Sequence, residues 1–331
     1  MLKKILNGLL LVCVLSASEM TLNEVIEDYR KNGIQSTQKI FDQFFTKESY
    51  WLSVLKNKDT DFGYYENMEY LFVSDKSIPT LWLYKLDHDH LTQIYQTNSI
   101  VGIGSGSKKL EGDKITPIGT YTFVDKLTKL DQYYGPMALA TNYPNLYDRI
   151  HKRSGSGIWI HGMPLNGDRQ DKNTKGCIAV ENNFIRQFHK NIDYSKAILI
   201  SYDKSRPRSE KEDLAKVLAM LFQWRDAWMR NDIKAYLEFY APDFKRADGM
   251  GYKKFASYKT RVFQKKESKK IEITQINLSP YPNDDGSLLF RLFFMQKYDA
   301  YKGEIHTYSS NDTKELYVEI RNNKPMILIE K

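Results

Sequence analysis

The stretch WIHGMPLNGDRQDKNTKGCIAV, from Trp159 to Val180, sets the organisation of the middle of this chain. A short apolar run ends at His161, a loop rich in Gly, Asn, Asp and Lys follows, and Cys177 stands directly before a second apolar run. Short apolar runs bounded by such loops are typical of β-strands. We therefore expect a strand at His161 and a loop that returns Cys177 to the end of that strand, on a turn before a short element.

A thiol and an imidazole held together are the chemically informative feature of this stretch. A thiol attacks carbonyl carbons as the thiolate, and a neighbouring imidazole can lower its pKa from about 8.5 and accept its proton. The carbonyl of Gly162 is a candidate to orient the ring of His161. An oxyanion pocket could be formed by the backbone amides of Lys175, Gly176 and Cys177. The residue types alone leave a Cys–His hydrolase or acyltransferase and a structural thiol equally open.

The N-terminus, MLKKILNGLLLVCVLSASEM, has the three parts of a secretory signal peptide. A basic start precedes an apolar run that is too short to span a membrane, and small residues precede Glu19. We expect cleavage after residue 18 and a periplasmic protein. A buried first helix and a lipoprotein attached through Cys13 are weaker interpretations. Cys177 would then be the one thiol of the mature chain, so it would be a reactive or intermolecularly paired group, or a buried small hydrophobe.

Composition and charge fit a globular, exported protein of more than one domain. The chain has 331 residues, 41% of them hydrophobic and 27% charged, and its net charge is +8. Residues 201–331 contain 25 Lys and Arg against 19 Asp and Glu, which accounts for six of those eight charges. An exported protein meets little nucleic acid, so we expect no such partner. Either an anionic cell-envelope polymer or simple solvation would explain the basic surface.

Hydrophobic periodicity predicts a multidomain fold: a short helical N-terminal segment, a mainly-β domain and an α+β C-terminal domain. Residues 19–65 hold more apolar side chains at helical spacing than so short a segment can bury, so we expect a homodimer through these helices. Residues 66–204 have the pattern of short strands, with a helix after Cys177. After a charged linker, the pattern predicts helices over 214–229, 233–244 and 252–263, and strands over 270–279, 288–300 and 315–331 with a turn at 322–325.

Two motifs give the middle domain a family resemblance. IWIHG followed by a loop and T-K-G-C-I, together with TPIGTY at residues 116–121, resembles the active-site signature of the L,D-transpeptidase catalytic-domain family. The resemblance covers about residues 70–201. It implies that Cys177 is the nucleophile, that His161 is its base, and that the carbonyl of Gly162 orients the histidine.

Four further residues are assigned to substrate or oxyanion binding: Trp159, Thr174, Lys175 and Gly176. Two departures from the family pattern bear on how substrate is held, because Lys175 stands where the family has a second His and Ala179 where it commonly has Arg. We expect Lys175 either to supply a cation near a substrate carboxylate or to be a solvated loop residue.

The C-terminal run QWRDAWMRNDIKAYLEFYAPDF resembles the opening of nuclear-transport-factor-2-like domains, which are cones of helices against a curved sheet. With this module at 205–331, the whole chain is similar to the cell-shape-determining peptidoglycan L,D-carboxypeptidases of helical Gram-negative bacteria. That resemblance implies removal of the terminal D-alanine from tetrapeptide stems through a cysteine thioester, giving tripeptides. The alternatives are an L,D-transpeptidase that makes cross-links or attaches proteins, and a non-catalytic envelope-binding module.

The remaining histidines and the C-terminal side chains carry less specific predictions. His88 and His90 stand two residues apart without further ligands, so we expect no metal, and we expect no organic cofactor. The aromatic residues from Trp224 to Tyr240 are expected in the core. Either a basic face for an acidic polymer or a solvated surface is expected from six lysines: Lys253, Lys254, Lys265, Lys266, Lys269 and Lys270.

Overall fold

The computed structural model describes residues 21–331 except 88, 168 and 208. The predicted signal peptide, which contains Cys13, lies outside this described part. His88, where we expect no metal, also lies outside it. The chain divides into two compact units, one that ends at Phe44 and one from Phe45 to Lys331. Among the helices so described, none is both long enough and apolar enough to cross a lipid bilayer.

The first unit is built from α1 (Leu22–Asn32) and most of α2 (Ile34–Phe45). The hydroxyl of Thr21 accepts a hydrogen bond from the amide of Glu24 and the carboxylate of Glu24 accepts one from the amide of Thr21, so the two residues cap α1. Gly33 ends the helix with a φ of 78°. Large apolar side chains stay exposed along these helices: Leu22, Ile26, Tyr29, Ile34 and Phe41.

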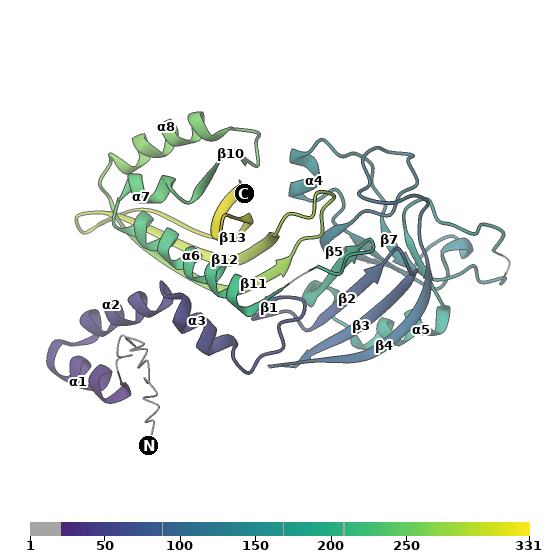
Figure 1. Cartoon of the computed structure of the whole chain (residues 1–331), viewed down its shortest axis with the longest axis horizontal. Helices are drawn as coiled ribbons and strands as arrows, with labels where there is room; N and C mark the ends of the chain where they lie inside the picture. Colours follow the sequence, from purple (N-terminus) through teal and green to yellow (C-terminus); the bar gives the residue numbers. More distant parts are fainter. Residues whose placement is uncertain (1–20, 88, 168, 208) are drawn as a thin grey trace, which may run out of the picture. The chain divides into compact units, whose positions relative to one another are not determined.

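A closed barrel of strands forms the first part of the second unit, as the strand-rich sequence predicts (Figure 1). Around the barrel the strands follow the order β2-β3-β4-β8-β7-β6-β5-β9. Their bounds are β2 (Tyr70–Asp75), β3 (Thr80–Asp87), β4 (His90–Ile100), β5 (Gly119–Leu127), β6 (Ala138–Thr141), β7 (Trp159–His161), β8 (Ile178–Val180) and β9 (Ala197–Tyr202). Its connections contain η1 (Gln132–Tyr134), α4 (Leu146–Ile150), α5 (Asn182–Asn191) and η2 (Tyr194–Lys196).

The barrel interior is filled by one side of each strand. Ile160 of β7 and both Ile178 and Val180 of β8 are fully buried there together with Phe72 and Phe123. Because successive side chains of a strand point to opposite faces, the residues that alternate with Ile160 and Ile178 face away from this core. The functional site lies on that opposite face.

Helices packed on one sheet form the C-terminal part of the second unit, which confirms the predicted α+β module. The helices are α6 (Lys211–Met229), α7 (Ile233–Leu237) and α8 (Tyr252–Phe263). The sheet has the order β1-β11-β12-β13-β14-β10. Its strands are β1 (Tyr64–Tyr65), β10 (Tyr240–Arg246), β11 (Ser268–Pro280), β12 (Leu289–Lys302), β13 (Ile305–Arg321) and β14 (Lys324–Glu330).

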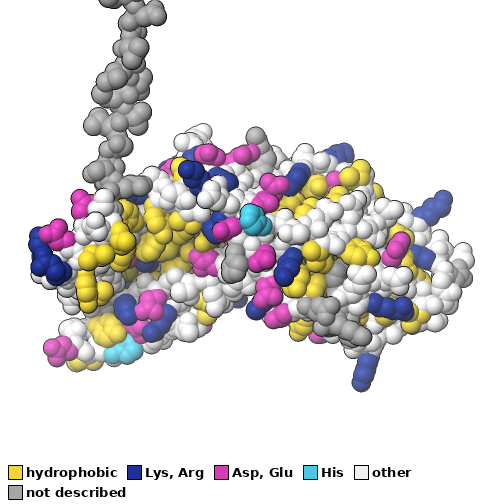
Figure 2. Space-filling model, turned by 90° about the horizontal axis from the view of Figure 1, so that it is seen from below, with side chains coloured by type: hydrophobic (Ala, Val, Ile, Leu, Met, Phe, Trp, Pro, Cys, Tyr) yellow, Lys and Arg dark blue, Asp and Glu magenta, His cyan; other side chains and the backbone are white. Residues whose placement is uncertain are grey.

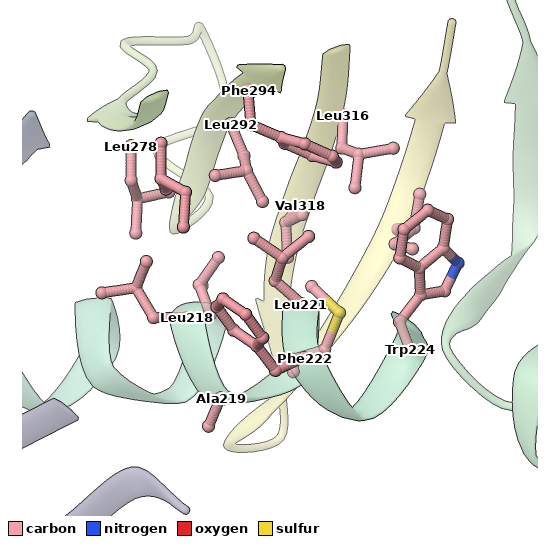
Figure 3. Close-up of a cluster of buried hydrophobic side chains, with 14 of the residues drawn as sticks. Leu218, Ala219, Leu221, Phe222, Trp224, Leu278, Leu292, Phe294, Leu316 and Val318 are labelled. Carbon is pink, nitrogen blue, oxygen red and sulfur yellow. The ribbon is translucent and has the colours of Figure 1, made fainter. Parts of the chain in front are cut away.

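The core of the C-terminal part lies between α6 and the sheet. Figure 3 shows Leu218 and Leu221 of α6 directed toward strand residues such as Leu292 and Leu316, and all four are fully buried. The predicted core placement of the aromatic series is confirmed for Trp224, Trp228, Tyr236 and Tyr240, which are buried, whereas Phe239 is only partly buried. The hairpin predicted around residues 322–325 joins β13 and β14.

One predicted helix is partly wrong. The helical pattern over 233–244 ends at Leu237, and Tyr240–Arg246 is instead strand β10, which pairs in parallel with β14 at the edge of the sheet. Pro242 gives the reason, because proline cannot donate the backbone hydrogen bond of a helix interior but is tolerated on an edge strand.

Helix α3 (Glu48–Leu55) packs on the C-terminal module rather than standing apart from it. The ring of Trp51 lies 5.5 Å from that of Phe222 on α6, and Leu55 is fully buried in the same core. Stacked and buried side chains of this kind fix the helix against α6.

The barrel and the C-terminal sheet are joined by buried polar contacts. The Thr120 hydroxyl donates to the carbonyl of Pro280 at 2.7 Å, and the Asn145 amide donates to the Tyr281 hydroxyl at 3.0 Å. Breaking these buried hydrogen bonds would leave polar groups unpaired and so would cost free energy. The two hydrogen bonds therefore help to hold the barrel against the C-terminal sheet.

Candidate active site

Cys177 and His161 come from neighbouring strands of the barrel. Strands β7 and β8 are parallel, with Ile160 opposite Ile178 and His161 opposite Ala179. Cys177 directly precedes β8, so the same register continues to place it beside Trp159. The side chains of Cys177 and His161 therefore share the face opposite the barrel core. They lie on neighbouring strands and are offset by two residues along the strand direction.

The ring of His161 is held in one tautomer by the backbone. Its Nδ1 lies 2.7 Å from the carbonyl oxygen of Gly162, and a carbonyl can only accept, so Nδ1 carries the proton and Nε2 presents a lone pair. Burial lowers the pKa of His161 to about 4, although the hydrogen bond to Gly162 opposes the shift and the charge of Arg169 adds to it. The imidazole is therefore neutral at neutral pH and able to accept a proton.

Cys177 is held through its carbonyl oxygen by two threonines. Thr174 Oγ1 donates to this oxygen at 2.6 Å and Thr116 Oγ1 approaches it at 3.5 Å. Thr116 belongs to the TPIGTY motif, and its Oγ1 also accepts a hydrogen bond from the amide of Gly102 at 2.8 Å. The upstream motif thus supports the backbone that carries the thiol.

The thiol of Cys177 is half-buried and hydrogen-bonded at rest. Its Sγ donates to the carbonyl of Gly157 at 3.3 Å. Burial raises the pKa of the Cys177 thiol, and this outweighs the lowering by the Trp159 amide and by the charge of Arg169. The expectation that the neighbouring imidazole lowers the thiol pKa is therefore wrong for the resting protein, in which thiol and imidazole are both neutral.

The four residues assigned to substrate or oxyanion binding lie in different surroundings. Trp159 is half-buried beside Cys177, Lys175 is exposed, and Thr174 and Gly176 are buried. The amide of Gly176 donates to the Thr174 hydroxyl at 3.1 Å, so this N–H is already used within the chain. The roles of Trp159 and Lys175 toward substrate stay predictions.

Tyr134, Gly135 and Asn182 also build the site, and sequence reasoning missed them. The ring of Tyr134 lies 5.1 Å from the ring of His161 and covers it edge-on. A Cβ on Gly162 would stand 2.2 Å from Asn182 Oδ1, and one on Gly135 would stand 2.7 Å from the Cα of Gly162. The backbone that orients the imidazole therefore needs glycine at both positions. Only the spacing of Gly135 before IWIHG could have hinted at this close approach.

Metal ligands are not gathered in the part of the chain that the structure describes. Within residues 21–331 other than 88, 168 and 208, no three His, Cys, Asp or Glu side chains are placed to hold an ion together. The neutral thiol of Cys177 and the neutral imidazole of His161 are suited to nucleophilic attack and proton transfer.

Comparison with known proteins agrees with this geometry. Residues 69–200 match the family model of the L,D-transpeptidase catalytic domain, and residues 216–331 match that of the Cds6 C-terminal NTF2-like domain. The structure resembles the helical cell shape determining protein Pgp2 from Campylobacter jejuni with 37% identity, 87% of this chain and 100% of that chain covered, and a TM-score of 0.80. The chain belongs to the Pgp2 family.

A second solved structure is less similar to this chain. Bd1075 of Bdellovibrio bacteriovorus is 25% identical, with 80% of this chain and 92% of that chain covered and a TM-score of 0.63. No curated protein matches the chain. In this Pgp2-family chain, the catalytic-domain match contains both Cys177 and His161, and the C-terminal match contains α7, α8 and most of α6.

Proposed function

We propose that the chain is a periplasmic, cysteine-dependent L,D-carboxypeptidase that removes the terminal D-alanine from peptidoglycan tetrapeptide stems and thereby affects cell shape. The observation that carries the proposal is the position of Cys177 beside β7, on the same face as a neutral His161 whose Nδ1 is fixed by the carbonyl of Gly162. The L,D-transpeptidase catalytic domain and the likeness to a cell-shape protein support the substrate class. The periplasmic location rests on the signal peptide predicted at residues 1–18.

In the acylation step, Nε2 of His161 accepts the Sγ proton as the sulfur attacks the carbonyl carbon on the L-centre of the diamino acid. The carbonyl π electrons move to oxygen and give a tetrahedral oxyanion. Its collapse breaks the C–N bond to D-alanine, and the imidazolium of His161 returns the proton to the leaving amine. A tripeptidyl thioester remains on Cys177.

Hydrolysis reverses the roles of the pair. His161 takes a proton from water as the water oxygen adds to the thioester carbonyl, and collapse then breaks the C–S bond. The thiolate of Cys177 regains its proton from the imidazolium, so the protein ends as it began. A peptide amine in place of water would form a cross-link instead. That transpeptidase reaction is the second candidate, because the matching catalytic-domain family carries its name.

Digestion of purified muropeptides distinguishes these reactions. Tetrapeptide muropeptides are incubated with the wild-type protein and with Cys177→Ala, and the products are weighed by mass spectrometry. The proposal expects loss of one alanine with the wild type alone. Dimer masses would mean transpeptidation, and unchanged substrate would mean that the chain acts as a binding module.

The C-terminal module is proposed to bind peptidoglycan rather than to catalyse. Its exposed lysines support this, because stem peptides end in carboxylates: Lys253, Lys254, Lys265, Lys266 and Lys270. Lys269 does not belong to that surface, because it is buried, bonds to Asn231 and lies over the ring of Phe263. On the face drawn in Figure 2, basic and acidic side chains are intermixed. Neither positive nor negative charge dominates this face.

Charge reversal tests the proposed binding role. Lys253→Glu combined with Lys254→Glu should weaken pelleting with purified sacculi at low salt, and less so at high salt, because exposed charges are screened over about 10 Å at 0.1 M. Turnover of a small soluble muropeptide should stay unchanged. An equal loss in both assays would instead assign these lysines to the stability of the protein.

A further inference from the structure

The loop that returns from β7 to β8 is anchored by backbone hydrogen bonds. The amide of Met163 donates to Asn182 Oδ1 at 2.9 Å, the amide of Leu165 donates to the carbonyl of Gln132 at 3.0 Å, and the amide of Thr174 donates to the carbonyl of Val101 at 2.9 Å. These contacts lie near both ends of the loop.

Arg169 lies in the middle of this loop and its guanidinium is held by the chain. Nε donates to the carbonyl of Asp171 at 3.1 Å, and Nη2 approaches the carbonyl of Asn173 at 3.4 Å. The guanidinium carbon lies 5.3 Å from the centroid of the Tyr133 ring, whose hydroxyl donates to Asp171 Oδ2 at 3.0 Å. Two carbonyls and a ring thus fix the plane of the cation.

The remaining nitrogen of this guanidinium meets no acceptor among the described residues. Nη1 of Arg169 is buried and has no hydrogen-bond partner among the residues that the structure describes, a set from which Asp168 is missing. The neighbouring acidic side chain within that set, Asp171, accepts from the Tyr133 hydroxyl. A buried N–H without an acceptor is costly, so a ligand acceptor would relieve a cost already present in the free protein.

The cation is connected to the reacting groups through packed rings, and its charge acts on them. A chain of ring contacts connects it to the base: Tyr133 lies 5.4 Å from Tyr134, and Tyr134 lies 5.1 Å from His161. On the other side, Asn173 precedes Thr174, whose hydroxyl holds the carbonyl of Cys177. In agreement, the positive charge of Arg169 lowers the pKa of both the His161 imidazole and the Cys177 thiol.

We propose that Arg169 is the substrate-binding residue that recognises the free carboxylate at the end of the stem peptide, and so confines cleavage to the terminal residue. This inference rests on the proposed function, in which the scissile carbonyl stands one residue before that carboxylate. A fixed, planar guanidinium with an unused N–H matches a carboxylate, which accepts in the same plane. Exposed Lys175, in contrast, lacks this fixed geometry.

The test compares two substrates that differ only at the terminal group. The kcat/KM for release of the terminal residue is measured with a tetrapeptide stem that has a free carboxylate and with its C-terminal amide. The proteins are the wild type, Arg169→Gln, Arg169→Lys and, as a control on the same loop, Lys172→Gln, whose side chain is exposed. The wild type should prefer the acid by about 10- to 100-fold, the range expected for a charge-assisted hydrogen bond.

Arg169→Gln should lose this preference, mainly through a higher KM for the acid and with little change for the amide. Arg169→Lys should retain part of it, and Lys172→Gln should retain all of it. Equal slowing of acid and amide by Arg169→Gln, or loss of the preference in Lys172→Gln, would overturn the assignment.

Binding to a non-reacting variant separates this inference from the proposed function. The two peptides are titrated calorimetrically into Cys177→Ala and into Cys177→Ala with Arg169→Gln, after thermal unfolding confirms that both variants are folded. Tighter binding of the acid in the first variant alone supports Arg169 even if the wild type releases no D-alanine. Equal affinities for acid and amide in Cys177→Ala would refute the assignment, whatever reaction the protein performs.

Discussion

The Nδ1 atom of His161 lies 2.7 Å from the carbonyl oxygen of Gly162, the next residue in the chain. This contact gives the imidazole its orientation without a carboxylate partner. The hydrogen bond to this uncharged carbonyl raises the pKa of His161 less than burial lowers it, so the resting histidine stays neutral. The pair with Cys177 therefore begins as thiol and imidazole rather than as an ion pair.

This resting state predicts an unusual pH dependence. Since burial lowers the pKa of His161 to about 4, the base stays unprotonated down to that pH, and kcat/KM for muropeptide cleavage should be level from pH 7 to about pH 5 and fall near pH 4. Alkylation of Cys177 without substrate should titrate above the ordinary thiol value, because burial raises the thiol pKa. An acidic limb near pH 6.5, with fast alkylation at pH 7, would indicate a pre-formed ion pair instead.

Removing the Thr174 hydroxyl should reduce activity more than it reduces stability. Thr174→Val deletes the donor to the carbonyl of Cys177 and the acceptor for the amide of Gly176, with a cost of about 1–3 kcal/mol for the unpaired buried groups. We expect a drop of at least about tenfold in kcat, measured with a soluble muropeptide. Thr92→Val, at an exposed position of β4, is the matched control. The same kcat in both variants would show that Thr174 does not position the nucleophile.

Lys259 is expected to destabilise the C-terminal module. Its Nζ lies 4.5 Å from the centroid of the Trp228 ring, and burial lowers its pKa to about 8, against the attraction of Glu330. In the unfolded chain this lysine has its ordinary pKa of 10.5, so between pH 8 and 10.5 the unfolded chain binds more protons than the folded protein. The free energy of unfolding therefore rises with pH through that window, and the destabilisation by Lys259 disappears.

Lys259→Met should accordingly raise the free energy of unfolding below pH 8 by roughly 3 kcal/mol, since one pKa unit corresponds to about 1.4 kcal/mol. Its advantage over the wild type should shrink toward pH 10.5 in chemical denaturation measured across that range. Lys253→Met, at an exposed position, should change stability little at any pH. A destabilised Lys259→Met protein at pH 7 would mean that the ring contacts outweigh the cost of burial.

The helices of the first unit should mediate self-association. Ile26 and Phe41 are 54% and 46% exposed, and an apolar surface of this kind is commonly covered by a second copy. Replacing both with Ser should convert a dimer into a monomer, as measured by light scattering. Ile78→Ser, at a 60% exposed position of the second unit, should leave the mass unchanged. A monomeric wild-type protein would contradict the predicted dimer.

Much of the site could be predicted because its chemistry is local in sequence. The strand before His161, the loop and the turn at Cys177 are encoded by apolar runs and glycines, and the structure places them as the pattern indicates. The family signature added the predicted role of Gly162, whose carbonyl oxygen lies 2.7 Å from Nδ1 of His161. Alternating and helical periodicity likewise predicted the barrel and the C-terminal module.

The supporting residues could not be predicted because they come from distant parts of the chain. Thr116 reaches the carbonyl of Cys177 from 61 positions away, and Asn182 fills the space beside Gly162 from 20 positions away. The thiol pKa was misjudged for a similar reason: burial depends on the packed fold, whereas the sequence displays only the neighbouring imidazole. Strand β10 was missed because helical spacing continued across Pro242.

The most direct test of the central claim follows the fate of the Cys177 thioester. Tetrapeptide muropeptide is mixed with the protein in oxygen-18-labelled water, and mass spectrometry is applied both to the rapidly quenched protein and to the products. The account predicts a transient tripeptidyl adduct on Cys177, absent from Cys177→Ala, together with free D-alanine and a tripeptide bearing one labelled oxygen in its new carboxylate. Label-free cross-linked dimers as the main product, or labelled tripeptide from Cys177→Ala, would contradict it.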